Sequence, residues 1–242
     1  MTVPADSWVI RQRDIFRSRR QALRFLYDKV ACTLLWKPVV EGLDNLPASG
    51  PAILMINHVT AVDPIAVLAT VRPRFVVPMS KIENFWNPLV GILVRSWGAY
   101  PVRRGEVDRE ALKTTLQLLE AGEITLIAPE GHRSPALIKP KDGLAYLATR
   151  TDSAPVIVPT AIYNLETWLR DLATPWRRTE VHLTFGQGFR LKVEPGAKRL
   201  PREVLAAMTD EMMYRLAMLL PEHNRGVYGD LSRATTHYLD FV

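Results

Sequence analysis

Short apolar segments that alternate with helical patterns are the feature that most restricts how this chain of 242 residues can fold. Such runs are typical of buried strands. Helical patterns begin near residue 63 and extend over residues 108–121 and 202–220. This alternation predicts an α/β fold with a largely parallel mixed sheet flanked by helices. The predicted strands are residues 51–56, 75–77, 100–102, 124–128, 156–158 and 181–185.

The first of these strands leads into the stretch Asn57-His58-Val59-Thr60-Ala61-Val62-Asp63-Pro64. Asp63 followed by Pro64 predicts a helix start. His58 is then expected in the turn that leaves the strand. A carboxylate bonded to one imidazole nitrogen would let the other nitrogen take a proton from an alcohol. The alternative is that Asp63 only caps the helix and His58 is a polar turn residue.

Two further predicted strands also end in polar turns. Glu130, Gly131 and Arg133 follow the strand over residues 124–128, and Arg104 follows the strand over residues 100–102. Glycine lets backbone approach a ligand, and the planar guanidinium of arginine suits phosphate. Ligands of parallel α/β sheets gather at the carboxyl ends of strands. The alternatives are a surface turn with a Glu–Arg pair and a solvated basic turn.

The N-terminal region carries most of the net charge. Residues 1–40 hold eight basic and three acidic residues, whereas the whole chain has a net charge of +6. Residues 7–36 lack glycine and proline and are predicted to be helical, with an apolar stripe that includes Leu26, Val30 and Leu34. We therefore divide the chain into a basic amphipathic helical segment for the membrane interface (1–40) and an α/β domain (41–242). The alternative for the helix is packing on the domain with a solvated basic face.

Several function classes lack their signatures in this sequence. There is no G-x-S-x-G, P-loop, G-x-G-x-x-G or zinc pattern, and nothing resembles a common nucleic-acid module. We therefore expect no metal and no nucleic-acid partner. The single cysteine, Cys32, favours a reducing compartment, and no apolar run is long enough to span a bilayer. These features predict a peripheral or monotopic protein on the cytoplasmic face of the cell membrane.

Taken together, the ordered motifs resemble the glycerophospholipid acyltransferase superfamily, typified by 1-acyl-glycerol-3-phosphate acyltransferases. The resemblance covers roughly residues 40–165. Two positions depart from the family pattern, because Ala128 replaces the usual Phe and His132 the usual Thr. The matching motifs are N-H-x-x-x-x-D at Asn57, His58 and Asp63, a glycine and arginine six apart at Gly98 and Arg104, Pro129-Glu130-Gly131-His132-Arg133-Ser134, and Val156-Ile157-Val158-Pro159.

The resemblance implies a transfer of a fatty acyl group to a lysophospholipid, with 1-acyl-glycerol-3-phosphate as the expected acceptor and phosphatidic acid as the product. The donor would be a thioester, acyl-CoA or acyl-carrier protein, and no cofactor would be needed. His58 would be the general base and Asp63 its partner. Acceptor binding would fall to Asn57, Arg104, Glu130, Gly131 and Arg133. The alternatives are another lysolipid or a glycolipid as acceptor, and a membrane-binding protein that keeps the fold without turnover.

Overall fold

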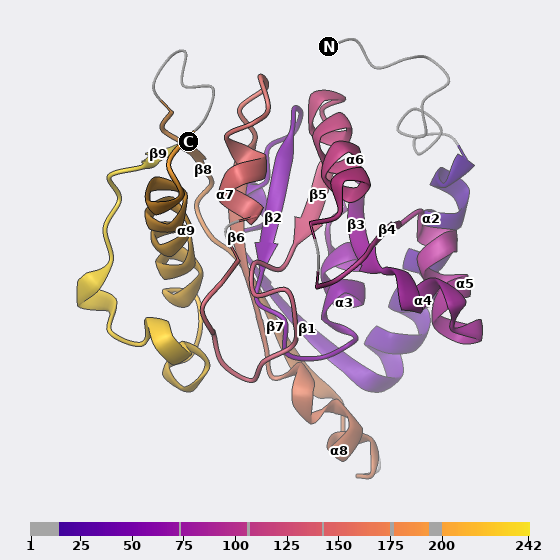
Figure 1. Ribbon diagram of the computed structural model, residues 1–242. Coiled ribbons are helices and arrows are strands. Elements are labelled where there is room, and N and C mark those ends of the chain that lie inside the picture. Colours follow the sequence, from indigo (N-terminus) through magenta and orange to yellow (C-terminus); the bar gives the residue numbers. More distant parts are fainter. Residues whose placement is uncertain (1–14, 73, 106, 142, 175–176, 194–199) are drawn as a thin grey trace.

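The structure, a computed structural model, describes residues 15–72, 74–105, 107–141, 143–174, 177–193 and 200–242. Within these ranges one mixed sheet forms the centre of the molecule (Figure 1). Its main path has the order β1-β7-β6-β2-β5-β3-β4, and β8 joins β6 to β9. The strands are β1 (Trp36–Glu41), β2 (Ala52–Ile56), β3 (Val76–Lys81), β4 (Tyr100–Val102), β5 (Ile124–Ile127), β6 (Val156–Tyr163), β7 (Thr179–Phe185), β8 (Phe189–Leu191) and β9 (Leu239–Phe241).

Most neighbouring strands run parallel. The strands β6, β2, β5, β3 and β4 are parallel to one another, so their carboxyl ends share one edge of the sheet. The strand β7 is antiparallel to β6 and parallel to β1, and β8 is antiparallel to β6 and β9. The predicted fold class, a largely parallel mixed sheet with flanking helices, is confirmed.

Helices cover both faces of the sheet, as the side chains of β2 illustrate. Ala52, Leu54 and Ile56 point to a core shared with α3, while Ile53 and Met55 pack with α6, α7 and α9 on the other face. All five are buried, which explains why this strand has no polar face. The α-helices are α2 (Arg17–Leu26), α3 (Asp63–Thr70), α4 (Ile82–Trp86), α5 (Pro88–Trp97), α6 (Arg109–Glu120), α7 (Gly143–Ala148), α8 (Trp168–Leu172) and α9 (Arg202–Ala217).

The C-terminal tail forms short 3₁₀ turns followed by a strand. The turns are η4 (Glu222–Asn224), η5 (Gly226–Tyr228) and η6 (Leu231–Arg233), and β9 then extends the sheet. Short 3₁₀ turns and an edge strand leave no periodic signal in the sequence. None of the helices in the described ranges is long and apolar enough to cross a bilayer.

The N-terminal segment differs from its prediction in two ways. The helix α2 continues as a π-helical stretch, η1 (Tyr27–Leu35), and β1 then pairs with β7. The expected division between residues 40 and 41 therefore falls inside a strand of the sheet. The part of the predicted helix before residue 15, with Trp8, lies outside the described residues.

The basic side chains of α2 do not all face solvent. Arg20 and Arg24 are buried: the Nε of Arg20 donates to the carbonyl of Trp97 (2.6 Å), and a guanidinium nitrogen of Arg24 donates to the carbonyl of Arg74 (3.0 Å). Burial lowers the pKa of both groups to about 10. The expectation of a basic face turned to solvent or lipid is wrong for these two residues, which attach the helix to the domain.

Candidate active site

Asn57 continues the β-ladder beyond the end of β2. Its Nδ2 donates to the carbonyl of Ile162 (2.7 Å), and its Oδ1 accepts from the N–H of Ile162 (2.8 Å). The side chain is buried and occupies backbone groups of β6 that β2 no longer reaches, because its register with β6 ends at Ile56. Asn57, expected to bind substrate, therefore sets where the following turn begins.

His58 and Asp63 meet in that turn. The Nδ1 of His58 lies 3.1 Å from the Oδ2 of Asp63, and the two side chains are 13% and 1% exposed. No described residue hydrogen-bonds to the Nε2 of His58. A carboxylate at Nδ1 favours the tautomer with the proton on Nδ1 and leaves Nε2 as an acceptor. The predicted pairing of imidazole and carboxylate is thus present in the fold.

Asp63 holds the turn together instead of capping α3. The N-cap position is Val62, and the Asp63 carboxylate accepts from the preceding backbone: from Val59 N–H (2.6 Å) and Thr60 N–H (2.7 Å) at Oδ2. The Thr60 hydroxyl donates to Oδ1. These donors compensate for the burial of a negative charge. These three hydrogen bonds fix the carboxylate opposite His58, which makes the fourth.

Glu130 is joined to the same turn from the end of β5. Its Oε2 accepts from the N–H of His58 (3.4 Å), and its Oε1 accepts from the N–H of Ile138 (3.0 Å). Burial raises the pKa of the Glu130 carboxyl, although these backbone donors and the nearby imidazole of His58 oppose the shift. Gly131 adopts φ +73°, which lets the chain turn sharply beside the site.

The two arginines predicted to bind the acceptor lie at different distances from the His58–Asp63 pair. Arg133 is exposed in the Glu130 turn, and the next residue, Ser134, donates its N–H to the carbonyl of His58 (2.8 Å). Arg104 is also exposed and follows β4, which is three strands from β2, roughly 14 Å at ordinary strand spacing. Arg104 therefore shares the edge of the sheet with His58 but not its immediate surroundings.

The loop that carries Arg104 is anchored to the start of α6. The carboxylate of Asp108 accepts from the N–H of Arg103 (2.8 Å) and from Glu110 and Ala111 in the first turn. The bond from Arg103 and the two helix N–H donors hold the pKa of the Asp108 carboxyl below its usual range. The helix α6 packs on both β4 and β5. The loop therefore connects the edge strand β4 to a helix that lies toward the middle of the sheet.

The C-terminal tail holds the loop after Glu130, a role that sequence reasoning missed. Leu137 donates its N–H to the carbonyl of Asn224 (2.9 Å) and accepts from Val227 N–H (3.0 Å), while the Asn224 side chain donates to Pro135 O (2.8 Å). Gly226 has φ +52°, and a Cβ there would lie 2.0 Å from the carbonyl oxygen of Leu137. The sequence shows a glycine at position 226, but only the fold shows that its backbone packs against the carbonyl group of Leu137.

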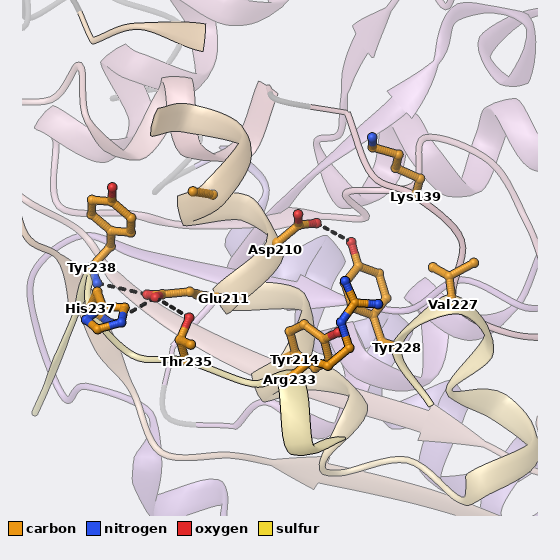
Figure 2. Close-up of a pocket in the computed structure, with 11 residues that line it drawn as sticks. Lys139, Asp210, Glu211, Tyr214, Val227, Tyr228, Arg233, Thr235, His237 and Tyr238 are labelled. Carbon is orange, nitrogen blue, oxygen red and sulfur yellow. Dashed lines mark hydrogen bonds between the residues drawn. The ribbon is translucent and has the colours of Figure 1, made fainter. Parts of the chain in front are cut away.

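The same tail encloses a cleft of about 470 Å³ against α9, shown in Figure 2. Its acidic side chains are already engaged in holding the tail. Asp210 accepts from the Tyr228 hydroxyl (2.7 Å), and Glu211 accepts from the Thr235 hydroxyl (2.6 Å) and two backbone N–H groups (Figure 2). His58 does not line this cleft. We therefore assign the cleft to docking of the tail and not to the candidate active site.

The paired imidazole and carboxylate at the carboxyl ends of parallel strands form a site that can take a proton from a hydroxyl group. The profile of the family described as Acyltransferase matches residues 37–163, more than half of the chain. The chain belongs to this family, which confirms the resemblance seen in the sequence.

Its relatives and a structural neighbour carry closely related names. A curated relative is the 1-acyl-sn-glycerol-3-phosphate acyltransferase of Bacillus subtilis, which is 29% identical over 192 residues, 79% of this chain and 92% of the relative. A protein of the same name from Borreliella burgdorferi is 28% identical over 132 residues, 53% of this chain and 52% of the relative. The crystal structure of the 1-acyl-sn-glycerophosphate acyltransferase PlsC from Thermotoga maritima shares the fold, with a TM-score of 0.58 and 22% identity over 84% of this chain and 83% of that one.

Proposed function

We propose that this acyltransferase moves a fatty acyl group from a thioester to 1-acyl-glycerol-3-phosphate, giving phosphatidic acid. The observation that carries the proposal is the His58–Asp63 pair, with Nδ1 held by a buried carboxylate and Nε2 without a described partner. The names of the relatives support the choice of acceptor. The donor is acyl-CoA or an acyl-carrier protein, because both present a carbonyl activated by sulfur.

His58 acts as the general base. Its Nε2 takes the proton of the acceptor hydroxyl as the oxygen attacks the thioester carbonyl carbon. The C–S bond then breaks, and the leaving thiolate takes the proton from the imidazolium. Asp63 stabilises the imidazolium while it exists, because its carboxylate lies 3.1 Å from Nδ1. General-base catalysis contributes about 10²–10⁴ in rate, so correct positioning of both substrates must contribute much of the remainder.

The acceptor phosphate binds to the arginines on the edge of the sheet. Arg133 extends from the turn bonded to His58, and no described residue forms a hydrogen bond or ion pair with its guanidinium. Arg104 approaches from β4 and adds a second cation. Glu130 and Gly131 shape the floor beneath the glycerol part. Asn57 supports the turn beneath the acceptor, because its side-chain amide is bonded to the backbone of β6.

We further propose that the enzyme works on the cytoplasmic face of the cell membrane as a peripheral or monotopic protein. The acceptor is a lipid, and the outward side of α2 and η1 exposes apolar side chains beside basic ones. Phe25 is 64% and Leu34 63% exposed, with Lys29 next to Phe25. A helix of this kind suits the interface of a bilayer that contains anionic lipids.

Acyl transfer from acyl-CoA to 1-acyl-glycerol-3-phosphate, measured by mass spectrometry of the products, tests the proposal. We expect His58→Ala to lose turnover while still binding the acceptor, and Arg133→Ala to lose mainly acceptor affinity. A wild-type rate in His58→Ala would exclude the base assignment. A panel of lysolipid and glycolipid acceptors identifies the substrate, and preference for an acceptor without phosphate would contradict the role of Arg133.

A further inference from the structure

A second exposed apolar surface lies on α4 and α5, far along the chain from α2. Its side chains Trp86, Leu89 and Ile92 are 70%, 79% and 65% exposed. Residues 86–94 contain no charged side chain, and Val90 and Pro88 are exposed as well. Scattered exposed apolar residues are ordinary, but a contiguous group of large ones with a tryptophan at its edge marks an interaction surface.

The helices α4 and α5, which carry these exposed side chains, are firmly packed on the domain. The side chain of Asn87 caps α5 by accepting from the N–H groups of Leu89 and Val90, both at 3.0 Å. Gly91 packs so closely that a Cβ there would lie 2.8 Å from the carbonyl oxygen of Phe85. Trp97 at the other end of α5 is buried and donates to the carbonyl of Val76 (2.8 Å). The helix pair is thus held by one side and presents Leu89 and Ile92 on the other.

The two apolar surfaces lie at the same end of the sheet. Arg20 of α2 bonds to the carbonyl of Trp97, the last residue of α5, and Arg24 stacks over Phe75 just before β3, with its Cζ 4.3 Å from the ring centroid. Figure 1 shows α2, α4 and α5 gathered beyond β4. The buried side of α2 carries Arg20 and Arg24 together with Leu23, which packs against the core. Phe25 and Leu26 are left on the exposed side of the same helix.

The charges around this end of the molecule complement an anionic surface. Basic side chains are exposed on α2 and η1, on α5 and in the loop after β4. The described acidic residues on the same elements and at the start of α6 only partly offset them; they are Asp28, Glu83, Asp108 and Glu110. The exposed basic residues are Arg17, Arg19, Lys29, Arg95, Arg103 and Arg104. Apolar side chains with a rim of cations match the interior and the headgroups of an anionic bilayer.

We propose that α4 and α5 form a second membrane anchor, which inserts Trp86, Leu89 and Ile92 into an anionic bilayer beside α2 and η1. This inference rests on the membrane location proposed above. The anchor immediately precedes β4, so docking brings the loop with Arg104 to the headgroup layer, where a phosphate-bearing lipid acceptor lies.

Vesicle binding with surface variants tests the anchor. We compare Leu89→Ser/Ile92→Ser with Val242→Ser, an exposed apolar residue of the C-terminal tail (54%) remote in sequence from the anchor. The probe is vesicles of phosphatidylglycerol and phosphatidylcholine, at two salt concentrations. We expect the double variant to partition at least about tenfold more weakly and the control to match the wild type. Brominated phosphatidylcholine should quench fluorescence in the wild type and less in Trp86→Phe.

The outcomes separate this inference from the proposed function. Weaker vesicle binding with an unchanged rate on a short-chain acceptor dispersed as monomers supports the anchor. Unchanged vesicle binding in the double variant, or quenching that does not depend on Trp86, overturns it. A wild-type dimer that the double variant converts to monomers without vesicles would assign the surface to a second copy and also overturn it. If the wild type shows no acyl transfer but the double variant still binds vesicles more weakly, the proposed reaction is refuted and the anchor is retained.

Discussion

Replacing Asp63 by asparagine tests the electrostatic role of the carboxylate without removing its hydrogen bonds. The amide oxygen can take the place of Oδ2 and accept from Val59 N–H, Thr60 N–H and the Nδ1 of His58. The amide NH₂ then replaces Oδ1, and the Thr60 hydroxyl turns from donor to acceptor. The variant keeps the shape of the turn and the tautomer of His58 and loses only the negative charge.

The size of the effect follows from the distance. Two unit charges about 4 Å apart attract each other by about 4 kcal/mol at an effective dielectric constant of roughly 20. The Nδ1–Oδ2 distance is 3.1 Å, and both side chains are largely shielded from water. Since each 1.4 kcal/mol corresponds to a factor of about ten, we expect kcat to fall by about 10²–10³, while KM changes little.

Steady-state kinetics with purified Asp63→Asn measures this effect, and thermal unfolding checks that the fold is retained. Thr60→Val is the matched control, because it removes one partner of the Asp63 carboxylate and leaves the charge in place. We expect less than about tenfold loss of kcat in the control. Wild-type kcat in Asp63→Asn, or an equal loss in Thr60→Val, would refute electrostatic stabilisation of the imidazolium as the role of Asp63.

Three other changes test the contacts that surround the site. Asn57→Ala leaves two buried backbone groups of β6 unpaired and should cost about 1–3 kcal/mol for each, measured as the urea dependence of unfolding. Gly226→Ala places a Cβ 2.0 Å from the oxygen of Leu137, so we expect a shifted loop and a raised KM for the acceptor; an unchanged KM would contradict this role of the tail. Asp108→Ala removes a cap and should cost about 1 kcal/mol near neutral pH. Because the N–H of Arg103 and the helix donors lower the pKa of Asp108, its contribution is present above about pH 4 and disappears as the pH falls through the lowered pKa, so thermal unfolding of variant and wild type should converge in acid.

Local patterns determined the order of the main elements. The apolar run of β2, the alternation of strands and helices, and the position of Asp63 at a helix start are all properties of neighbouring residues, and the structure agrees with them. The same holds for the pairing of His58 with Asp63, because the four residues of turn between them leave few other arrangements. These features were predictable because short-range sterics and hydrophobic periodicity dictate them.

Other features depend on which distant segments meet. The inward direction of Arg20 and Arg24 is decided by the carbonyl groups and aromatic rings they contact near β3 and α5.

The support that Asn224 and Gly226 give to the loop after Glu130 likewise joins segments almost ninety residues apart. A sequence shows which residues carry charge, bulk or a left-handed turn. Only tertiary packing decides which remote backbone groups those side chains satisfy, because burial of polar groups is compensated by whatever donor or acceptor the fold brings near.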